Sequence, residues 1–257
     1  MDQLLTILPL PLLLAALVIA FLAGIVKGIV GFSMPTILLS GISTFASPEL
    51  ALAGLLLPTL FTNAMQSLRF GAAELWGTVL RFRIFLITGA VTIFGAAQLV
   101  PFIPAQALLI VIGGAVTCFA LWQLTSLAPA PGQWVQRPML EVVFGALAGT
   151  VGGISGMWGP PTVAYLTAIG TEKRQQILAQ GVIYGLGAVL LVIAHTKSGI
   201  LNATTLPLSL ALLPTAILGM WVGGRLSDRF DQVMFRRATL FVLIVSGLNL
   251  LRRGLMG

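Results

Sequence analysis

Two glycine-rich segments that run into proline hold the residues best placed to do chemistry. The first spans Gly24–Pro35 and the second Gly149–Pro161. Glycine weakens a helix by up to about 1 kcal/mol relative to alanine, and proline favours the first turn of the helix that follows. Each segment is therefore expected to be a half-helix, an extended stretch and a new helix start. The free N–H groups at two such starts would together form an anion-binding site without a metal.

Close packing of helices through small residues is the alternative interpretation of these glycines. For either segment alone, packing is the better explanation. The two segments align with each other, however, and the matched pairs at one offset are Gly28 with Gly153, Gly31 with Gly156, and Pro35 with Pro160. Two aligned breaks with flanking prolines favour a binding site.

Lys27 lies within the first break, where the second segment has Gly152. A charge within the bilayer costs at least about 2.5 kcal/mol on insertion scales, and such residues are functional by default. We expect Lys27 to bind an anionic head group as a point charge. The alternative is a lysine whose side chain extends to the membrane surface from a shallow break.

Other polar side chains within apolar runs extend the candidate site. Asn63 and Gln66 lie in the second run, and His195, the only histidine, ends the sixth. His195 titrates near neutral pH, although a helix-end anchor at the lipid head groups explains it equally well. Trp158 would form an apolar wall of the site or pack elsewhere. The predicted substrate-binding residues are Lys27, Gly28, Gly31, Asn63, Gln66, Gly152, Gly153, Ser155, Gly156, Trp158 and His195.

The elements that position these residues are membrane helices. Hydrophobic residues make up 58% of the 257-residue chain and charged residues only 8%, against roughly 25% charged in a soluble domain. The apolar runs approach the length of about 20 residues that a helix needs to span a bilayer, and they lack the alternation of barrel strands. The sequence predicts an all-α polytopic membrane protein. Its net charge of +7 lies in short basic clusters between runs, as expected for cytoplasmic loops rather than for nucleic-acid binding.

The apolar runs form two similar halves. The first half is predicted over residues 1–127, a proline-rich linker over 128–138 and the second half over 139–257. Each half begins with a broken element and continues with three further helices, a construction typical of secondary transporters. The eight elements are 4–45, 49–68, 76–100, 104–127, 138–169, 175–194, 205–225 and 233–251.

The distribution of basic residues indicates that the two halves are inverted. Eight simple crossings would divide the basic residues almost evenly between the two sides. If both broken elements are hairpins, ten basic residues share one side and three the other, as the positive-inside rule requires. The ten are Arg69, Arg81, Arg83, Arg137, Lys173, Arg174, Arg225, Arg229, Arg236 and Arg237; the three are Lys197, Arg252 and Arg253. The charge count does not decide whether the first broken element crosses the membrane fully, because its N-terminal residues carry no basic side chain.

Several kinds of chemistry lack the residues they need. All seven carboxylates lie in or beside expected loops, so a carboxylate proton relay is unsupported. The sequence shows neither a His/Asp/Glu metal cluster nor a serine paired with a base, which argues against an enzyme, a metal site and a cofactor. The lone Cys118 excludes a disulfide within the chain. A coupling proton or cation and assembly into a homo-oligomer both remain open.

The paired breaks, Gly28, Gly31 and Pro35 with Gly153, Gly156 and Pro160, resemble those of the sulfite exporter TauE/SafE family, also called the 4-toluene sulfonate uptake permease family. The resemblance covers nearly the whole chain. It implies a multi-pass permease of the bacterial inner membrane that moves sulfite, sulfonates or sulfinates such as hypotaurine by alternating access. Lys27 and Phe32 stand where the family often has glycine or a small residue. An anion channel and a non-transporting accessory subunit are the alternative functions.

Overall fold

The computed structural model describes residues 7–99, 102, 104–125, 135–155, 158–227 and 232–256. Helices are the only extended regular elements within these ranges, which confirms the all-α prediction. Four helices are long and apolar enough to cross a membrane, and a fifth span exists if one bent pair is counted as a single crossing. The chain is therefore a polytopic membrane protein. The greater part of the predicted linker, residues 128–134, lies outside the described residues.

Each predicted half begins with a broken helix, which is followed among the described residues by four helices in the first half and three in the second. The first half contains α2 (Leu10–Val30), α3 (Met34–Ile42), α4 (Pro48–Leu68), α5 (Ala72–Arg81), α6 (Arg83–Ala97) and α7 (Ala105–Leu124). The second half contains α8 (Pro138–Ser155), α9 (Gly159–Ala168), α10 (Lys173–Lys197), α11 (Leu206–Ser227) and α12 (Gln232–Met256).

Both predicted breaks are present. Gly31 ends α2 with a left-handed backbone (φ +83°), and its N–H donates a hydrogen bond to the carbonyl of Lys27 (2.7 Å). Glycine adopts this conformation without the steric cost that a Cβ imposes. Ser33 is also left-handed (φ 73°), and Pro35 lies in the first turn of α3. In the second half, α8 ends at Ser155 and α9 begins at Gly159.

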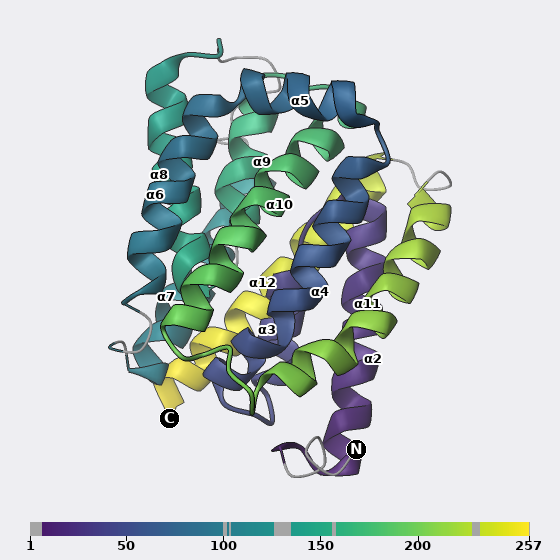
Figure 1. Ribbon diagram of the computed structural model, residues 1–257, viewed down its shortest axis with the longest axis vertical. Helices are drawn as coiled ribbons and strands as arrows, with labels where there is room; N and C mark the ends of the chain where they lie inside the picture. Colours follow the sequence, from purple (N-terminus) through teal and green to yellow (C-terminus); the bar gives the residue numbers. More distant parts are fainter. Residues whose placement is uncertain are drawn as a thin grey trace.

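The third apolar run differs from the single helix expected over residues 76–100. It is divided at Phe82 into α5 and α6, whose axes are bent by 77°. No residue of α5 is buried, and the helix lies across the upper end of the molecule in Figure 1. The carboxylate of Glu141, buried at the start of α8, accepts a hydrogen bond from the backbone N–H of Phe85 (3.3 Å). This bond satisfies a free N–H group in the first turn of α6 and so stabilises the bend.

Each half packs its broken helix against a helix of the other half. Helix α2 lies along α11, and α8 lies along α6, while α4 packs on α10 and α7 on α12. Glycines allow the closest contacts, since a Cβ on Gly24 would collide with the backbone of Ala216, and one on Gly145 would lie 2.7 Å from the carbonyl oxygen of Phe85. The two halves therefore interlock and share one core.

Helix α2 runs in the opposite direction to α8, and α4 runs in the opposite direction to α10. In Figure 1, α2 and α4 begin at the lower end, whereas α8 and α10 begin at the upper end, where α5 lies. Arg81, Lys173 and Arg225 belong to the ends of α5, α10 and α11 at the top of Figure 1, and Lys197 and Arg252 belong to the ends of α10 and α12 at the bottom.

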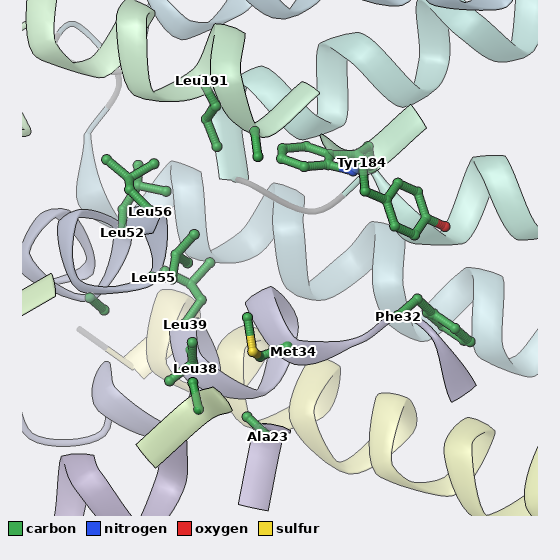
Figure 2. Close-up of a cluster of buried hydrophobic side chains, with 14 of the residues drawn as sticks. Ala23, Phe32, Met34, Leu38, Leu39, Leu52, Leu55, Leu56, Tyr184 and Leu191 are labelled. Atoms are coloured by element: carbon green, nitrogen blue, oxygen red, sulfur yellow. The ribbon is translucent and has the colours of Figure 1, made fainter. Parts of the chain in front are cut away.

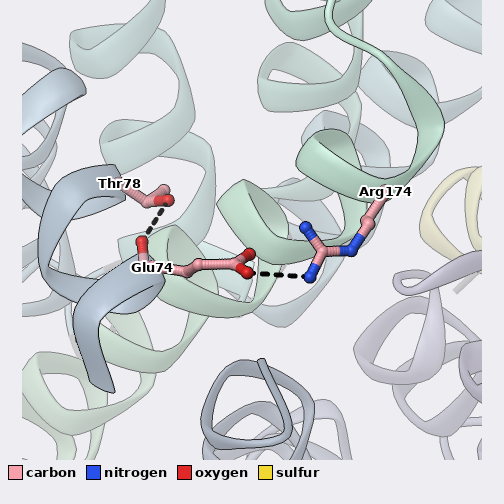
Figure 3. Close-up of polar contacts among 3 residues, drawn as sticks. All are labelled: Glu74, Thr78 and Arg174. Carbon is pink, nitrogen blue, oxygen red and sulfur yellow. Dashed lines mark hydrogen bonds and ion pairs between the residues drawn. The ribbon is translucent and has the colours of Figure 1, made fainter. Parts of the chain in front are cut away.

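At the upper end, one ion pair joins α5 of the first half to α10 of the second. Figure 3 shows Arg174 donating a hydrogen bond to the carboxylate of Glu74 (2.8 Å). Thr78 donates to the backbone carbonyl of Glu74 one turn away (2.9 Å), as is usual within a helix. Both charged side chains are largely exposed, so the pair positions α5 more than it stabilises the fold.

The core beside the first break is apolar. Figure 2 shows Met34, Leu38 and Leu39 of α3 facing Leu52, Leu55 and Leu56 of α4, and all six are buried. This packing fixes the short helix α3, whose nine residues are too few to be stable alone. The start of α3 thereby lies beside α4, the helix that carries Asn63.

Candidate functional site

Lys27 lies in the last turn of α2, and its side chain is only 1% exposed. The ammonium group donates a hydrogen bond to the side-chain oxygen of Asn63, which is also buried, on α4. Burial of a charge is costly unless the charge is both hydrogen-bonded and paired with an opposite charge. The neutral amide of Asn63 supplies a hydrogen bond but no opposite charge, so an anion beside Lys27 would supply the missing partner.

A small cavity of about 20 Å³ lies beside Lys27 and Asn63. The first turn of α3 contributes Ser33, Pro35 and Thr36 to its wall, and the start of α9 contributes Trp158 and Gly159. The structure thus brings together the two helix starts that follow the breaks. The hydroxyl of Ser33 is buried and has no hydrogen-bond partner among the described residues.

Aromatic rings form the remaining wall of the cavity. They belong to Phe32, Trp158 and Tyr184; Figure 2 labels Phe32 in the first break and Tyr184 on α10. The hydroxyl of Tyr184 donates to the carbonyl of Gly159 (3.3 Å), and the ring of Trp158 lies 6.2 Å from that of Tyr184. The cavity therefore combines one cation, amide and hydroxyl groups, and an apolar wall, a common composition for an organic anion site.

A second polar group lies next to the first break, between α4 and α10. A Cβ on Gly31 would lie 2.6 Å from the side-chain oxygen of Gln180 and 3.0 Å from the side-chain nitrogen of Gln66. Gln66 donates to the carbonyl of Ile177 (2.9 Å). Both glutamine side-chain oxygens are buried without a hydrogen-bond partner among the described residues. This group keeps unused hydrogen-bonding capacity one helical turn from Asn63.

Gln180 is a polar residue that the sequence interpretation missed. It stands near the start of an apolar run that also contains Gln175 and Gln176, a pattern typical of a polar helix end. The structure buries it, at 2% exposure, whereas the side chain of Gln175 lies in the exposed contact with Arg81. The usable signal was its helical spacing, because Gln180 shares a face with Ile177 and Tyr184.

Two of the glycines predicted to line the site pack against neighbouring groups and do not line the Lys27 cavity. The Cβ direction of Gly28 points into the backbone of α11 at Met220. That of Gly152 points at the ring of Trp158, 2.6 Å from its nearest atom. Gly28 therefore allows α2 to approach α11, and Gly152 leaves the space that the tryptophan ring occupies.

His195 lies apart from the Lys27 cavity, towards the lower end of α10. It is fully buried, its ring lies beside the backbone of Gly153, and Nδ1 lies 3.4 Å from the hydroxyl of Ser198. The structure therefore joins His195 to the second break. Ser155 is the last residue of α8, and Gly156 falls outside the described residues. Among the described residues, no group of three His, Cys, Asp or Glu side chains is arranged to hold a metal ion.

Comparison with known proteins identifies the family. The family model described as "Sulfite exporter TauE/SafE" matches residues 16–250. No curated protein and no solved structure matches the chain. The matched region includes both breaks, Lys27, Asn63 and the helices that enclose the cavity. The chain therefore belongs to the sulfite exporter TauE/SafE family, a family of membrane transport proteins.

Proposed function

We propose that this protein is a secondary transporter of small sulfur-containing anions, and that it binds them between the two breaks. The observation that carries the proposal is the convergence of Lys27, Asn63 and both helix starts on one buried cavity. Sulfite, sulfonates and sulfinates share a compact head with several acceptor oxygens. A lysine ammonium, helix N–H groups and a free serine hydroxyl supply the donors that such a head requires.

Binding exchanges one hydrogen-bond partner of Lys27 for another. In the described conformation the ammonium donates one hydrogen bond to the neutral oxygen of Asn63. An anion at the cavity offers a charged oxygen, and charge-assisted hydrogen bonds are roughly twice as strong as neutral ones. Asn63 then turns its amide N–H groups towards the anion or towards Gln66. Substrate binding therefore needs no other charged residue at this site.

The cavity size supports transport by alternating access. A volume of about 20 Å³ holds roughly one water molecule. An oxyanion needs more space, so the elements around the site must separate to admit it. The short helices α3 and α9, each joined to its neighbour at a break, are the elements able to move without unfolding a long helix.

We propose that residues 1–127 and 139–257 are inverted repeats in the bacterial inner membrane, with the α5 end in the cytoplasm. The opposite directions of corresponding helices and the exchanged pairing of α2 with α11 and α8 with α6 support this arrangement. The basic helix ends beside α5 support the orientation.

Flux through the purified protein in proteoliposomes tests this function. We expect saturable uptake of labelled sulfite or a small sulfonate, accelerated when unlabelled anion is loaded on the opposite side. Uptake that neither saturates nor responds to the opposite side would indicate an anion channel. Absence of flux for every anion, from protein shown to be folded, would contradict transport and favour an accessory subunit.

A further inference from the structure

His195 is a buried basic side chain that does not line the Lys27 cavity. The hydroxyl of Ser198 donates to the backbone carbonyl of His195 (3.4 Å), so its oxygen can accept the proton of Nδ1, which lies 3.4 Å away. Nε2 is then the ring nitrogen that keeps a lone pair. It is buried and has no hydrogen-bond partner among the described residues. The ring therefore has one position at which it can accept a proton.

The ring of His195 lies at the end of the second broken helix. It is beside the backbone of Gly153, in the last turn of α8, which ends at Ser155. The last four carbonyl groups of a helix have no N–H partner within it, and they carry a partial negative charge. A proton on Nε2 would meet acceptor oxygens and a favourable field there. The first break also has a basic side chain at this point, since Lys27 lies in the last turn of α2.

The ionisable side chains on the helices packed against α10 lie away from His195. They are Glu49 of α4, Glu74 and Arg81 of α5, Arg83 of α6, Glu141 of α8 and Tyr165 of α9. Those of α5, α6 and α8 lie at the upper end of the molecule, and Tyr165 packs among the rings of Phe82, Phe85 and Phe144.

Two charged residues lie near the same end of the bundle as His195. Glu49 is exposed at the start of α4, and Lys197 is exposed at the end of α10, where its ammonium lies over the ring of Phe94 (5.3 Å). Neither forms an ion pair with the histidine. A proton at His195 therefore adds a positive charge that no carboxylate among the described residues neutralises.

One face of α10 connects His195 with the anion cavity. Tyr184, which lines the cavity, lies three helical turns earlier on this face, about 16 Å along the axis. Between them, a Cβ on Gly187 would lie 3.4 Å from the ring of Trp158, and one on Gly152 of α8 would lie 2.6 Å from it. The ring separates the cavity from an open apolar groove between α6, α8 and α10. A shift of α8 against α10 at His195 therefore moves two walls of the anion cavity.

We propose that His195 is a proton-binding site, and that one proton at this site is carried together with each monovalent anion at Lys27. The neutral ring takes up the proton at Nε2, and its release on the other side of the membrane restores the neutral ring. Proton and anion have opposite charges within a medium of low dielectric constant, so each favours the binding of the other. The inference rests on the proposed function, because the proton accompanies the anion of the Lys27 site.

Ser198 gives the proton a short path to His195. It follows the last residue of α10 and is half-buried, so its hydroxyl links the ring to the lower end of the molecule. This end is opposite α5 and faces the periplasm in the orientation proposed above. A proton gradient directed into the cell would then drive uptake of the anion.

Accumulation of methanesulfonate in proteoliposomes tests the proposal. Methanesulfonate is the anion of a strong acid, so it stays singly charged near neutral pH and does not cross lipid as the free acid. The buffer contains potassium and no sodium, valinomycin holds the membrane potential at zero, and the interior is about one pH unit more alkaline than the outside. With one proton per anion, wild-type protein should concentrate labelled methanesulfonate up to about tenfold inside. Vesicles without protein give the background.

His195→Gln and Lys197→Gln form a matched pair of substitutions on α10. Glutamine can form hydrogen bonds at position 195 but takes up no proton at these pH values. We expect His195→Gln to exchange labelled for unlabelled methanesulfonate above the background, because exchange needs no net movement of protons. Its accumulation ratio should fall close to one. Lys197→Gln removes an exposed basic group two residues away and should accumulate methanesulfonate as wild type does.

The outcomes separate this inference from the proposed function. If wild-type protein exchanges methanesulfonate but does not accumulate it, transport stands without proton coupling and the inference is overturned, a result that needs no variant. If His195→Gln accumulates methanesulfonate as wild type does, the proton binds elsewhere and the inference is again overturned. If wild-type protein exchanges neither methanesulfonate nor sulfite, the proposed function itself fails.

Discussion

The ammonium group of Lys27 donates a buried hydrogen bond to the side chain of Asn63, 36 residues further along the chain. Both residues belong to the first half, yet the cavity they border is closed by Trp158, Gly159 and Tyr184 of the second. Lys27, the one charged residue among the described residues of the cavity wall, therefore faces a helix start of the other half. A movement of one half relative to the other changes the surroundings of that charge directly. A carrier requires such a dependence, because its substrate must bind its two conformations with different affinities.

Removal of the charge at Lys27 should weaken anion binding and leave the fold intact. Lys27→Met keeps the length of the side chain and suits an apolar surrounding, so we expect sulfonate affinity to fall by about tenfold or more with little loss of thermal stability. Titration calorimetry and a melting curve on the same sample check both. Lys197→Met, at an exposed helix end, is the matched control and should bind as wild type does. Unchanged affinity in Lys27→Met would remove the lysine from the site.

A carboxylate placed beside Lys27 should compete with the substrate. Asn63→Asp converts the present hydrogen bond into an ion pair, so we expect the affinity for sulfonates to fall by about tenfold or more while the protein stays folded. Uptake in proteoliposomes and direct binding measure the effect. Asn202→Asp, on an exposed loop, adds the same charge at a distance and should alter neither. Wild-type affinity in Asn63→Asp would show that the substrate does not use the Lys27 ammonium.

Substitution of two glycines that have a left-handed backbone distinguishes the effect of backbone strain from the effect of crowding at the site. Gly199→Ala and Gly31→Ala both introduce a Cβ at positive φ, at a cost of roughly 1–2 kcal/mol. Nothing lies within 4 Å of the Cβ direction of Gly199, whereas that of Gly31 meets Gln180 and Gln66. We therefore expect both variants to melt earlier, and only Gly31→Ala to lose transport as well. Equal transport by the two folded variants would mean that the glutamine pair has no role in transport.

A pair of helical glycines tests the interlocking of the halves. Gly28→Ala drives a Cβ into the backbone of α11, so we expect a loss of stability of about 1–3 kcal/mol, the usual cost of overpacking. Gly77→Ala, within α5, meets nothing within 4 Å and should raise stability by about 0.5–1 kcal/mol. Melting temperatures in one detergent rank the two against wild type. A Gly28→Ala protein as stable as wild type would show that α2 and α11 are less closely packed than described.

The positions of both breaks could be predicted from the sequence, because glycine and proline act on the backbone within a few residues of themselves. The same local physics accounts for the membrane class, since a run of apolar residues needs no partner to prefer lipid. Lys27 could be identified as a candidate functional residue for a related reason. A charge within an apolar run costs free energy whatever the run packs against.

The direction in which each residue faces was decided only by the tertiary structure. Nothing in the sequence distinguishes Gly28 from Gly31. In the structure Gly28 contacts α11, whereas Gly31 faces Gln180. Contacts with helices distant in the chain also decide three other features. These are the burial of Gln180, the bend at Phe82 and the position of Trp158 between the Lys27 cavity and the apolar groove. Helix formation and the preference for lipid are properties of short segments. The neighbour that a given side chain faces is decided by close packing between segments, and the order of residues along one helix does not specify that packing.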